Sequence, residues 1–309
     1  MQTVFYFFER SKKLGDSVVK CLGNTDNIEV GSFETNIFSD SETKLVAKDN
    51  VAGKKVIILC SNTQPVNDSV MRLLILIDGL KRGGAEEIIF IAPYLGYSRQ
   101  DRQQFPNEPV TVQLFVNLLK TAGVDKIYRF DPHSEYNADF FSIPVISVTT
   151  EALFANYFEN LFKTTRILPS NVVVLSPDHG AINRGKTLQS LLKGVGFASI
   201  TKKRVGPDQI KTIGFEGNIK NKIALIFDDI SSSGQTIIEA VGVARKQGAK
   251  KVFIAVSHAV FSTQASEKLC LLKVNDFVVT NSIESNTMKG THIIDIAPLV
   301  ADIIKNEAI

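Results

Sequence analysis

The sequence predicts an α/β protein made of two similar domains in tandem, each a mainly parallel sheet flanked by helices. Short apolar runs rich in Val, Ile and Phe recur along the 309 residues and are nearly continuous rather than alternating. Such runs are typical of strands that are buried on both faces of a parallel sheet. Helix-length amphipathic segments at 66–84 and 234–249 separate some of these runs, and each ends in a glycine-containing stop. This alternation indicates a layered α/β fold.

The expected strands follow one another in a regular order along the chain. Three lie in the first half, as KKVIILC, EEIIFIA and DKIYRFD at 54–60, 86–92 and 125–131. Three lie in the second half, as NVVVLSP, NKIALIFDD and KKVFIAV at 171–177, 221–229 and 250–256.

A faint internal repeat supports two similar domains. The stretch GAEEIIFIAPYLGYS at 84–98 resembles GAKKVFIAVSHAVFS at 248–262, and each follows a long amphipathic segment. Strand–helix alternation is a generic pattern, so a chance likeness between two βαβ units stays open. We expect one domain at 1–147 and a second at 148–309, with the last helix free to pack back on the first domain.

The composition gives no reason to expect a nucleic-acid or membrane partner. The 35 basic and 32 acidic residues leave a net charge of +3, and no apolar run is long enough to span a membrane. The first residues lack the layout of a signal peptide. The three cysteines, Cys21, Cys60 and Cys270, are far apart and have no metal-binding spacing, which is typical of reduced thiols. We therefore expect a cytoplasmic protein.

The stretch IALIFDDISSSGQTIIEA at 223–240 carries the first chemical signal. A turn between a parallel strand and a helix lies at the sheet edge where α/β proteins bind ligands. Backbone N–H groups at the helix start favour a phosphate, and small hydroxyl-bearing residues let it approach. Asp228 and Asp229 would repel a phosphate, but they suit sugar hydroxyls or a metal. The pattern predicts a sugar phosphate site; a plain solvated helix cap is the alternative.

This stretch resembles the ribose-phosphate loop of type I phosphoribosyltransferase-fold proteins. Four more stretches narrow the resemblance to the ribose-phosphate diphosphokinases, or phosphoribosyl pyrophosphate synthetases, over nearly the whole chain: PYLGYSRQDRQ (93–103), RFDPHSEYNADFF (129–141), SPDHGAINRGKTL (176–188) and TKKRVGPDQ (201–209). The resemblance implies two tandem phosphoribosyltransferase-like domains. It implies transfer of the β,γ-diphosphoryl group of ATP to O1 of ribose 5-phosphate, with Mg²⁺, giving phosphoribosyl diphosphate and AMP for nucleotide biosynthesis.

The segment at 93–103 offers a guanidinium to a polyphosphate and a carboxamide to a base or ribose. Read alone, it could equally be a charged surface turn. The resemblance implies that Arg99, Gln100 and Asp101 contact ATP and that His133 contacts Mg²⁺-ATP. A lysine common further along the family's loop is replaced here by Gln103 or Gln104.

The segment NIFSDSETKL at 36–45 is by itself a polar turn before a strand. The resemblance implies that it reaches the ATP site of an adjacent subunit. Phe38 would then stack on adenine, while Asp40 and Glu42 would accept hydrogen bonds. A shared site requires a homo-oligomer, with a dimer as the minimal unit and a tetramer or hexamer open.

The second half carries the remaining site residues that the resemblance implies. The ribose 5-phosphate site comprises Asp228, Asp229, Ser232, Ser233, Gly234, Gln235 and Thr236. The pyrophosphate loop comprises Asp178, His179, Gly180 and Ala181, with His179 as loop backbone only. Lys202 and Arg204 would be the catalytic cations of the basic loop at 201–209, which by itself would be an exposed loop. His133 and Asp178 would hold Mg²⁺.

Some questions stay open in the sequence. Asp228 or Asp229 could act as a general base, but nothing decides between them. Phosphate-activated members of the family often carry an arginine where Ala52 stands, so allosteric control by phosphate and ADP is open. His133 follows Pro132, where the family more often has another apolar residue.

Two rival functions differ in class. A phosphoribosyltransferase that consumes phosphoribosyl diphosphate and a nucleobase would share DDISSSGQT, but it would not need YSRQDR, DPHS or a twin domain. A non-catalytic, synthetase-like regulatory subunit should have lost its loop and metal residues, which this chain retains.

Overall fold

The computed structural model describes residues 2–25, 27–134, 140–206, 209–284 and 290–308. The chain divides into two compact units. The first comprises Met1–Val148 together with Ser282–Glu284 and Asp295–Ile309. The second comprises Thr149–Asn281 and Ser285–Ile294. Each is a mixed α/β unit with a mainly parallel sheet, so the predicted fold class is confirmed.

The first unit contains a six-stranded sheet in which all neighbouring strands are parallel. In spatial order its strands are β2 (Ile28–Val30), β1 (Thr3–Phe7), β5 (Lys55–Leu59), β6 (Glu87–Ala92), β7 (Lys126–Phe130) and β8 (Val145–Val148). The three predicted strands of the first half are β5, β6 and β7. A separate antiparallel hairpin joins β3 (Phe33–Ile37) to β4 (Thr43–Ala47).

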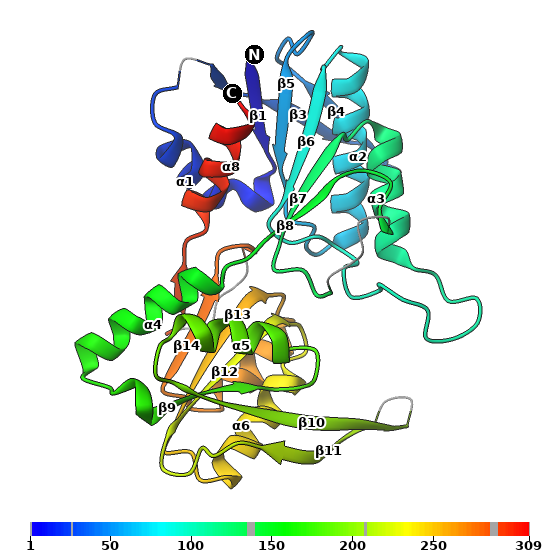
Figure 1. Cartoon of the computed structure of the whole chain (residues 1–309). Helices are drawn as coiled ribbons and strands as arrows, with labels where there is room; N and C mark the ends of the chain where they lie inside the picture. Colours follow the sequence, from blue (N-terminus) through cyan, green and yellow to red (C-terminus); the bar gives the residue numbers. More distant parts are fainter. Residues whose placement is uncertain (1, 26, 135–139, 207–208, 285–289, 309) are drawn as a thin grey trace. The chain divides into compact units, whose positions relative to one another are not determined.

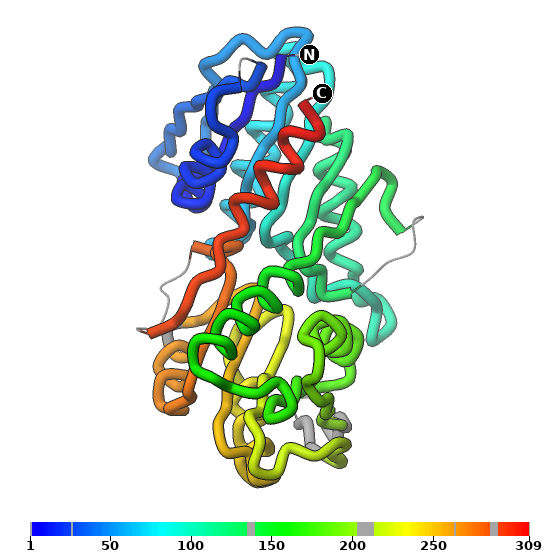
Figure 2. Tube along the Cα trace, turned by 60° about the vertical axis from the view of Figure 1, so that its left-hand side comes forward, coloured from blue at the N-terminus to red at the C-terminus, as the bar shows by residue number. Residues whose placement is uncertain are grey.

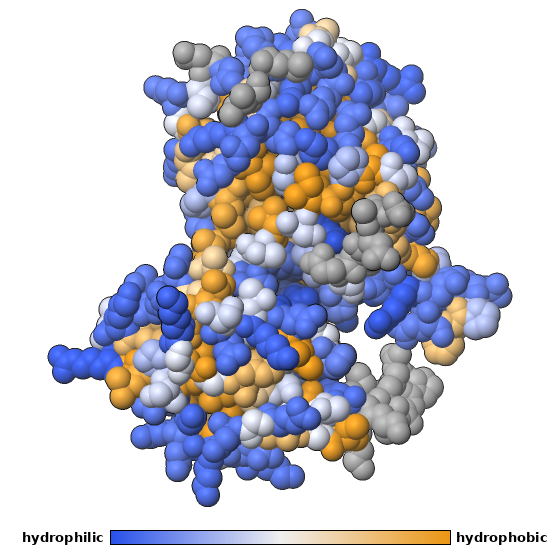
Figure 3. Space-filling view, viewed as in Figure 1, coloured by the Kyte–Doolittle hydropathy of each residue, from blue (hydrophilic) through white to orange (hydrophobic). Residues whose placement is uncertain are grey.

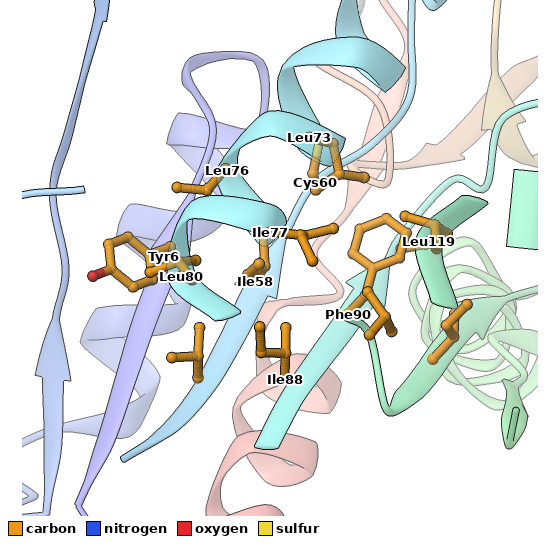
Figure 4. Close-up of a cluster of buried hydrophobic side chains, with 14 of the residues drawn as sticks. Tyr6, Ile58, Cys60, Leu73, Leu76, Ile77, Leu80, Ile88, Phe90 and Leu119 are labelled. Carbon is orange, nitrogen blue, oxygen red and sulfur yellow. The ribbon is translucent and has the colours of Figure 1, made fainter. Parts of the chain in front are cut away.

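Helices cover both faces of this sheet. Figure 1 shows α2 (Val66–Arg82) and α3 (Thr111–Ala122) on one face, and α1 (Lys12–Leu22) and α8 (Ala297–Glu307) on the other. In Figure 4, side chains of β1, β5 and β6 pack against α2 and α3. Ile58, Leu73 and Phe90 are 0% exposed in this core. The nearly continuous apolar runs therefore fill a sheet that is covered on both sides.

The surface of the first unit carries both hydrophobic and hydrophilic residues. On the face shown in Figure 3, hydrophobic residues gather in a band across this unit, while hydrophilic residues cover its rim.

Within the described residues, no helix is both long and apolar enough to cross a lipid bilayer.

The second unit contains a seven-stranded sheet. In spatial order its strands are β11 (Gln209–Glu216), β10 (Gly196–Gly206), β9 (Val172–Ser176), β12 (Ile223–Ser231), β13 (Lys251–Ala259), β14 (Asp276–Thr280) and β15 (His292–Ile294). Only the β10–β11 pair is antiparallel. The predicted strands of the second half are β9, β12 and β13.

Four helices pack on this sheet: α4 (Glu151–Thr165), α5 (Ile182–Leu191), α6 (Gln235–Lys246) and α7 (Thr263–Cys270). One core contains Phe154 and Phe158 of α4 with Leu188 of α5. The other contains Ile237 and Val241 of α6. The amphipathic segment predicted at 234–249 is therefore α6, whose apolar face lies against the sheet.

In the basic stretch at 201–209, which by itself was expected to be an exposed loop, the described residues 201–206 and 209 belong instead to a strand pair. The first part of the stretch belongs to β10, which pairs with β11 from Ser199↔Glu216 to Gly206↔Gln209. The ladder shifts register between Thr201 and Lys202 and again between Arg204 and Gly206. The lysines and arginine obscured a ribbon that is also rich in β-branched residues, which favour strands.

The C-terminal helix belongs to the first unit, although it follows the second along the chain. In Figures 1 and 2, α8 is drawn in red beside the blue N-terminal part of this unit. The Glu307 carboxylate lies 2.9 and 3.0 Å from Lys126 Nζ and also accepts a hydrogen bond from the Tyr128 hydroxyl. The Glu307 side chain is only 12% exposed, and these contacts with β7 fix α8 against the sheet.

We expect Glu307→Gln to lower the free energy of unfolding by about 2 kcal/mol at pH 7, because a largely buried ion pair loses one charge. Burial alone would raise the pKa of Glu307, but hydrogen bonds from Tyr128 and Lys126 outweigh it and lower the pKa. Its stabilisation is thus present above the ordinary glutamate pKa and is lost as pH falls through the lowered one. Urea unfolding at several pH values should show the difference from wild type narrowing below about pH 4.5. A constant difference would contradict this assignment.

Candidate active site

The predicted ribose-phosphate loop lies between strand β12 and helix α6. Strand β12 continues to Ser231, which still pairs with Ala259 of β13. Asp228 and Asp229 therefore lie within the strand, beyond the point where the apolar run ends. They are only 6% and 3% exposed. The sequence placed the end of the strand at residue 229, and the continued pairing with β13 accounts for the difference.

The turn that follows is short. Gly234 precedes the first residue of α6 and has φ +74°, a conformation that suits glycine. A Cβ at Gly234 would lie 3.1 Å from Leu269 Cγ, so the site is also tight. Ser233 Oγ accepts a hydrogen bond of 3.4 Å from the Gln235 backbone N–H. The turn leads directly into the N-terminus of α6, where Thr236 is the second helical residue, and such an end favours an anion.

Asp228 and Asp229 are buried next to other charged groups, which alters the pKa of Asp228. Burial raises the pKa of Asp228 well above its ordinary value, and the negative charges of Asp229 and Asp178 raise it further. Arg184 opposes this rise. Its Nη1 lies 3.3 Å from Asp229 Oδ1. Asp228 Oδ1 also accepts a hydrogen bond of 3.0 Å from the Asp229 backbone N–H. The structure thus brings the predicted ribose-phosphate loop and the predicted pyrophosphate loop into one acidic cluster with a guanidinium.

The pyrophosphate loop links β9 to α5. The Asp178 carboxylate accepts a hydrogen bond of 3.2 Å from the Ala181 backbone N–H, and Ser176 Oγ donates one of 2.8 Å to the Asp178 carbonyl. His179 and Gly180 are exposed, whereas Ala181 is buried. A Cβ at Gly180 would be 3.4 Å from Asp178 Oδ1, an ordinary contact. Packing within the chain therefore does not demand this glycine.

The predicted catalytic lysine lies on β10. Lys202 Nζ is 3.0 Å from Glu239 Oε2 of α6, and the lysine side chain is 10% exposed. Gln235 Nε2 donates a hydrogen bond of 2.8 Å to the other oxygen of Glu239. The backbone of Arg204 belongs to β10, but its side chain lies outside the described residues.

The first unit brings two of the predicted ATP segments together. Residues 99–101 follow β6, and His133 follows the neighbouring strand β7. Ser134 Oγ donates a hydrogen bond to Asp101 across these segments. The Gln100 side chain accepts a hydrogen bond of 2.6 Å from Thr111 Oγ1 at the start of α3. The parallel order of β6 and β7 explains why segments distant in sequence meet at one sheet edge.

The third predicted ATP segment forms the tip of the β3–β4 hairpin. The Phe38 backbone N–H donates to the Glu42 carbonyl at 2.8 Å, and Asp40 Oδ1 accepts from the Glu42 backbone N–H at 3.1 Å. The Phe38 side chain is 47% exposed. Ser41 has φ +74°, as expected in a tight turn. The hairpin therefore presents an aromatic ring at the surface.

Comparison with known proteins gives two family matches along the chain. The N-terminal domain of ribose phosphate pyrophosphokinase matches residues 4–123, and the phosphoribosyl synthetase-associated domain matches residues 195–307. The ribose-phosphate pyrophosphokinase of Corynebacterium ammoniagenes is 34% identical over 297 residues, which cover 95% of this chain and 90% of that protein. The chain belongs to the ribose-phosphate pyrophosphokinase family.

Further similarities extend over both units. The ribose-phosphate pyrophosphokinase of Bacillus caldolyticus is 33% identical over 306 residues, which cover 98% of this chain and 94% of that protein. The crystal structure of phosphoribosylpyrophosphate synthetase from Mycobacterium smegmatis superimposes with a TM-score of 0.89 at 31% identity, covering 99% of each chain. The family resemblance expected from the motifs is therefore confirmed.

Sequence reasoning missed two residues that contact the predicted site residues. Arg184 lies within the quoted stretch at 176–188, yet only the fold shows that its guanidinium reaches Asp229. Glu239 lies on the second turn of α6, one turn after Gln235, a spacing that places the two on one helix face. That spacing was available in the sequence, but the pairing with Lys202 on β10 was not.

Asp178, one of the two residues proposed for Mg²⁺, lies in an acidic cluster that suits that ion. Among the residues that the structure describes, no three His, Cys, Asp or Glu side chains form a ready metal cage. Mg²⁺ typically uses one or two carboxylates together with waters and substrate phosphates. Burial raises the pKa of Asp228 most, and the neighbouring negative charges of Asp229 and Asp178 raise it further. A cation at this cluster would offset those neighbouring charges.

Proposed function

We propose that this chain transfers the β,γ-diphosphoryl group of ATP to ribose 5-phosphate, giving phosphoribosyl diphosphate and AMP. The single observation that carries the assignment of residues is the buried Asp228–Asp229 pair, which directly precedes a phosphate-type turn at the start of α6. In the reaction, O1 of the ribose bonds to the β-phosphorus, and the bond between that phosphorus and the oxygen it shares with the α-phosphate breaks. AMP leaves with that oxygen, and the O1 proton passes to a base or water.

We assign the 5-phosphate of the sugar to the turn at 232–236. Backbone N–H groups at the start of α6 and the hydroxyls of Ser232, Ser233 and Thr236 would donate to it. Asp228 and Asp229 would accept hydrogen bonds from the ribose hydroxyls. This division keeps the carboxylates on the neutral part of the ligand, which explains why acids adjoin a phosphate site.

The loop at 178–181 would receive the diphosphate. Gly180 is exposed and has room for a side chain, so its small size is better explained by a ligand that approaches the backbone closely. Asp178 in the second unit is our candidate to hold Mg²⁺ beside the diphosphate, and His133 in the first unit is our candidate to contact Mg²⁺ that arrives with ATP. When bound, Mg²⁺ neutralises phosphate charge and orients the diphosphoryl group. Asp178 Oδ1 accepts a hydrogen bond from the Ala181 backbone N–H, and the second oxygen of the carboxylate would face the ion or its waters.

The positive charge that the transfer requires would come from Lys202 and Arg204. Phosphoryl transfer depends on positioning and charge neutralisation more than on covalent chemistry. Two cations that approach the diphosphoryl group stabilise the transition state more than the ground state, since charge there is redistributed.

We assign ATP to Arg99, Gln100, Asp101 and His133 in the first unit, and to the hairpin tip of a second copy. Phe38 at that tip would stack on the adenine, with Asp40 and Glu42 as hydrogen-bond acceptors. The hairpin and the neighbouring helix expose several large apolar side chains, as expected of a surface that meets another chain: Ile37 at 63%, Val46 at 43% and Met71 at 56%.

We expect Phe38→Ala to raise the KM for ATP about tenfold, because stacking of a base on an aromatic ring contributes about 1–3 kcal/mol. The KM for ribose 5-phosphate should not change. Initial rates over a range of ATP concentrations measure this effect. Leu271→Ala, at a position that is 77% exposed on the second unit, is the matched control. An unchanged KM for ATP in Phe38→Ala would contradict the role of the hairpin.

The function is tested by incubating purified protein with Mg²⁺, ATP and ribose 5-phosphate and following AMP release with a coupled assay. We expect AMP only when both substrates are present. A phosphoribosyltransferase would instead release pyrophosphate from phosphoribosyl diphosphate and a nucleobase. A regulatory subunit would release nothing. The match of residues 4–123 to the N-terminal pyrophosphokinase domain favours the diphosphokinase over the transferase.

A further inference from the structure

The ion pair between Lys202 and Glu239 has a consequence for the reaction. The two atoms, Nζ and Oε2, are 3.0 Å apart, and the side chains are 10% and 30% exposed. Glu239 has a second partner, since Gln235 Nε2 donates to its Oε1 at 2.8 Å. Burial alone would raise the pKa of Glu239, but the hydrogen bonds from Gln235 and Lys202 lower it, so the carboxylate is charged at neutral pH.

A lysine in this arrangement is poorly suited to neutralise phosphate. Its charge is balanced by a carboxylate at contact distance, so the pair as a whole contributes little positive potential to a ligand. The transition state of phosphoryl transfer needs uncompensated positive charge. Lys202 must therefore exchange Glu239 for the diphosphoryl group during each turnover.

We propose that Glu239 is a positioning residue that holds Lys202 against α6 in the ligand-free protein and competes with the diphosphoryl group for it. This proposal rests on the assignment of Lys202 in the proposed function. Gln235 links the predicted 5-phosphate turn to this ion pair, because it belongs to the turn and also donates a hydrogen bond to Glu239. When its carboxamide turns to a bound sugar phosphate, Glu239 loses one of its two donors, and its carboxylate is no longer held in the orientation that faces Lys202.

The substitution Glu239→Gln removes the negative charge of the side chain and keeps its size and shape. Glutamine has the same length, and its amide oxygen can still accept the hydrogen bond from Gln235. The ionic attraction to Lys202 is lost, and the amide NH2 that replaces Oε2 cannot accept a hydrogen bond from Lys202 Nζ. The apparent affinity for a ligand equals the intrinsic affinity multiplied by the fraction of protein that is competent to bind. Release of Lys202 from Glu239 increases this fraction and should therefore raise the apparent affinity for ATP. For a partly exposed pair we expect a KM for ATP about fivefold lower, with kcat within about twofold of wild type.

The experiment is a double-mutant cycle on purified full-length protein. Initial rates at saturating ribose 5-phosphate give KM and kcat for wild type, Glu239→Gln, Lys202→Met and the double variant. Glu267→Gln, at an exposed position on α7, controls for the loss of one negative charge in the same unit. Thermal melting of every variant checks that it is folded.

We expect Glu239→Gln to lower the KM for ATP in the wild-type background and to leave it unchanged when residue 202 is Met. An unchanged or higher KM in the single variant would overturn the proposal. An equal decrease in both backgrounds would also overturn it, since general attraction of an anion, and not Lys202, would then be the cause. If Lys202→Met kept wild-type turnover, the assignment of Lys202 itself would fail, an outcome distinct from the other two.

Discussion

Lys202→Ala is expected to lower turnover by about 10³-fold or more, by analogy with the loss of an arginine that stabilises phosphoryl-transfer transition states. The physical reason is that an uncompensated cation is removed where charge is redistributed during the reaction. Binding of ribose 5-phosphate should persist, because the acids and the turn that would hold it lie on other elements, β12 and α6. Coupled AMP release measures turnover, and calorimetric titration with ribose 5-phosphate measures binding.

Lys250→Ala is the matched control for this substitution. Lys250 is an exposed residue of the same unit, just before β13, and its backbone N–H donates to the Lys222 carbonyl, a bond that alanine keeps. We expect wild-type turnover from this variant. Turnover of Lys202→Ala within tenfold of wild type would remove the lysine from the catalytic machinery.

Asp228→Asn is expected to have two opposite effects. The affinity for ribose 5-phosphate should fall about 10- to 100-fold, because a hydrogen bond to a charged acceptor contributes about 1.5–3 kcal/mol. The ligand-free protein should become more stable at pH 7. Burial and the charges of Asp229 and Asp178 raise the pKa of Asp228, so holding it ionised in the folded protein costs free energy. Asparagine carries no charge, and its amide oxygen can still accept from the Asp229 N–H.

The pH dependence of stability provides an internal check on this variant. Because the folded protein holds the Asp228 proton more tightly than the unfolded chain, wild-type stability falls as pH rises from about 4 through the raised pKa. Melting temperatures of wild type and Asp228→Asn should therefore converge toward pH 4 and separate toward pH 7. Asp302→Asn, at an exposed position on α8, should show no such separation. A lower melting temperature of Asp228→Asn at pH 7, with full affinity for the sugar, would contradict the account.

The core strands could be predicted from sequence because their apolar runs are long and unambiguous. The segments predicted at 54–60, 86–92 and 221–229 correspond to strands β5, β6 and β12 in the structure, and the residues of these strands are mostly buried. The β3–β4 hairpin and the β10–β11 ribbon were not predicted. Their strands mix charged and β-branched residues, and their pairing is settled by contacts that a local pattern does not contain.

The site shows the same limit. Asp228, Asp229 and the following turn could be picked out as candidates because acids and small residues after an apolar run are typical of a ligand-binding site. Arg184 and Glu239 are ordinary helix residues in the sequence. Their importance arises from tertiary distances, 3.3 Å to Asp229 and 3.0 Å to Lys202. A sequence pattern fixes which loops share a sheet edge, but it does not fix which side chains meet there.

The central claim is that the diphosphoryl group is transferred from ATP to the sugar as one intact unit. ATP labelled with ³²P at the β-position and with ¹⁴C in the adenine tests it directly in a reaction with Mg²⁺ and ribose 5-phosphate. We predict that ¹⁴C appears in AMP and that ³²P appears in an acid-labile sugar diphosphate, in equal molar amounts. Recovery of ³²P as free pyrophosphate or in ADP would contradict the account.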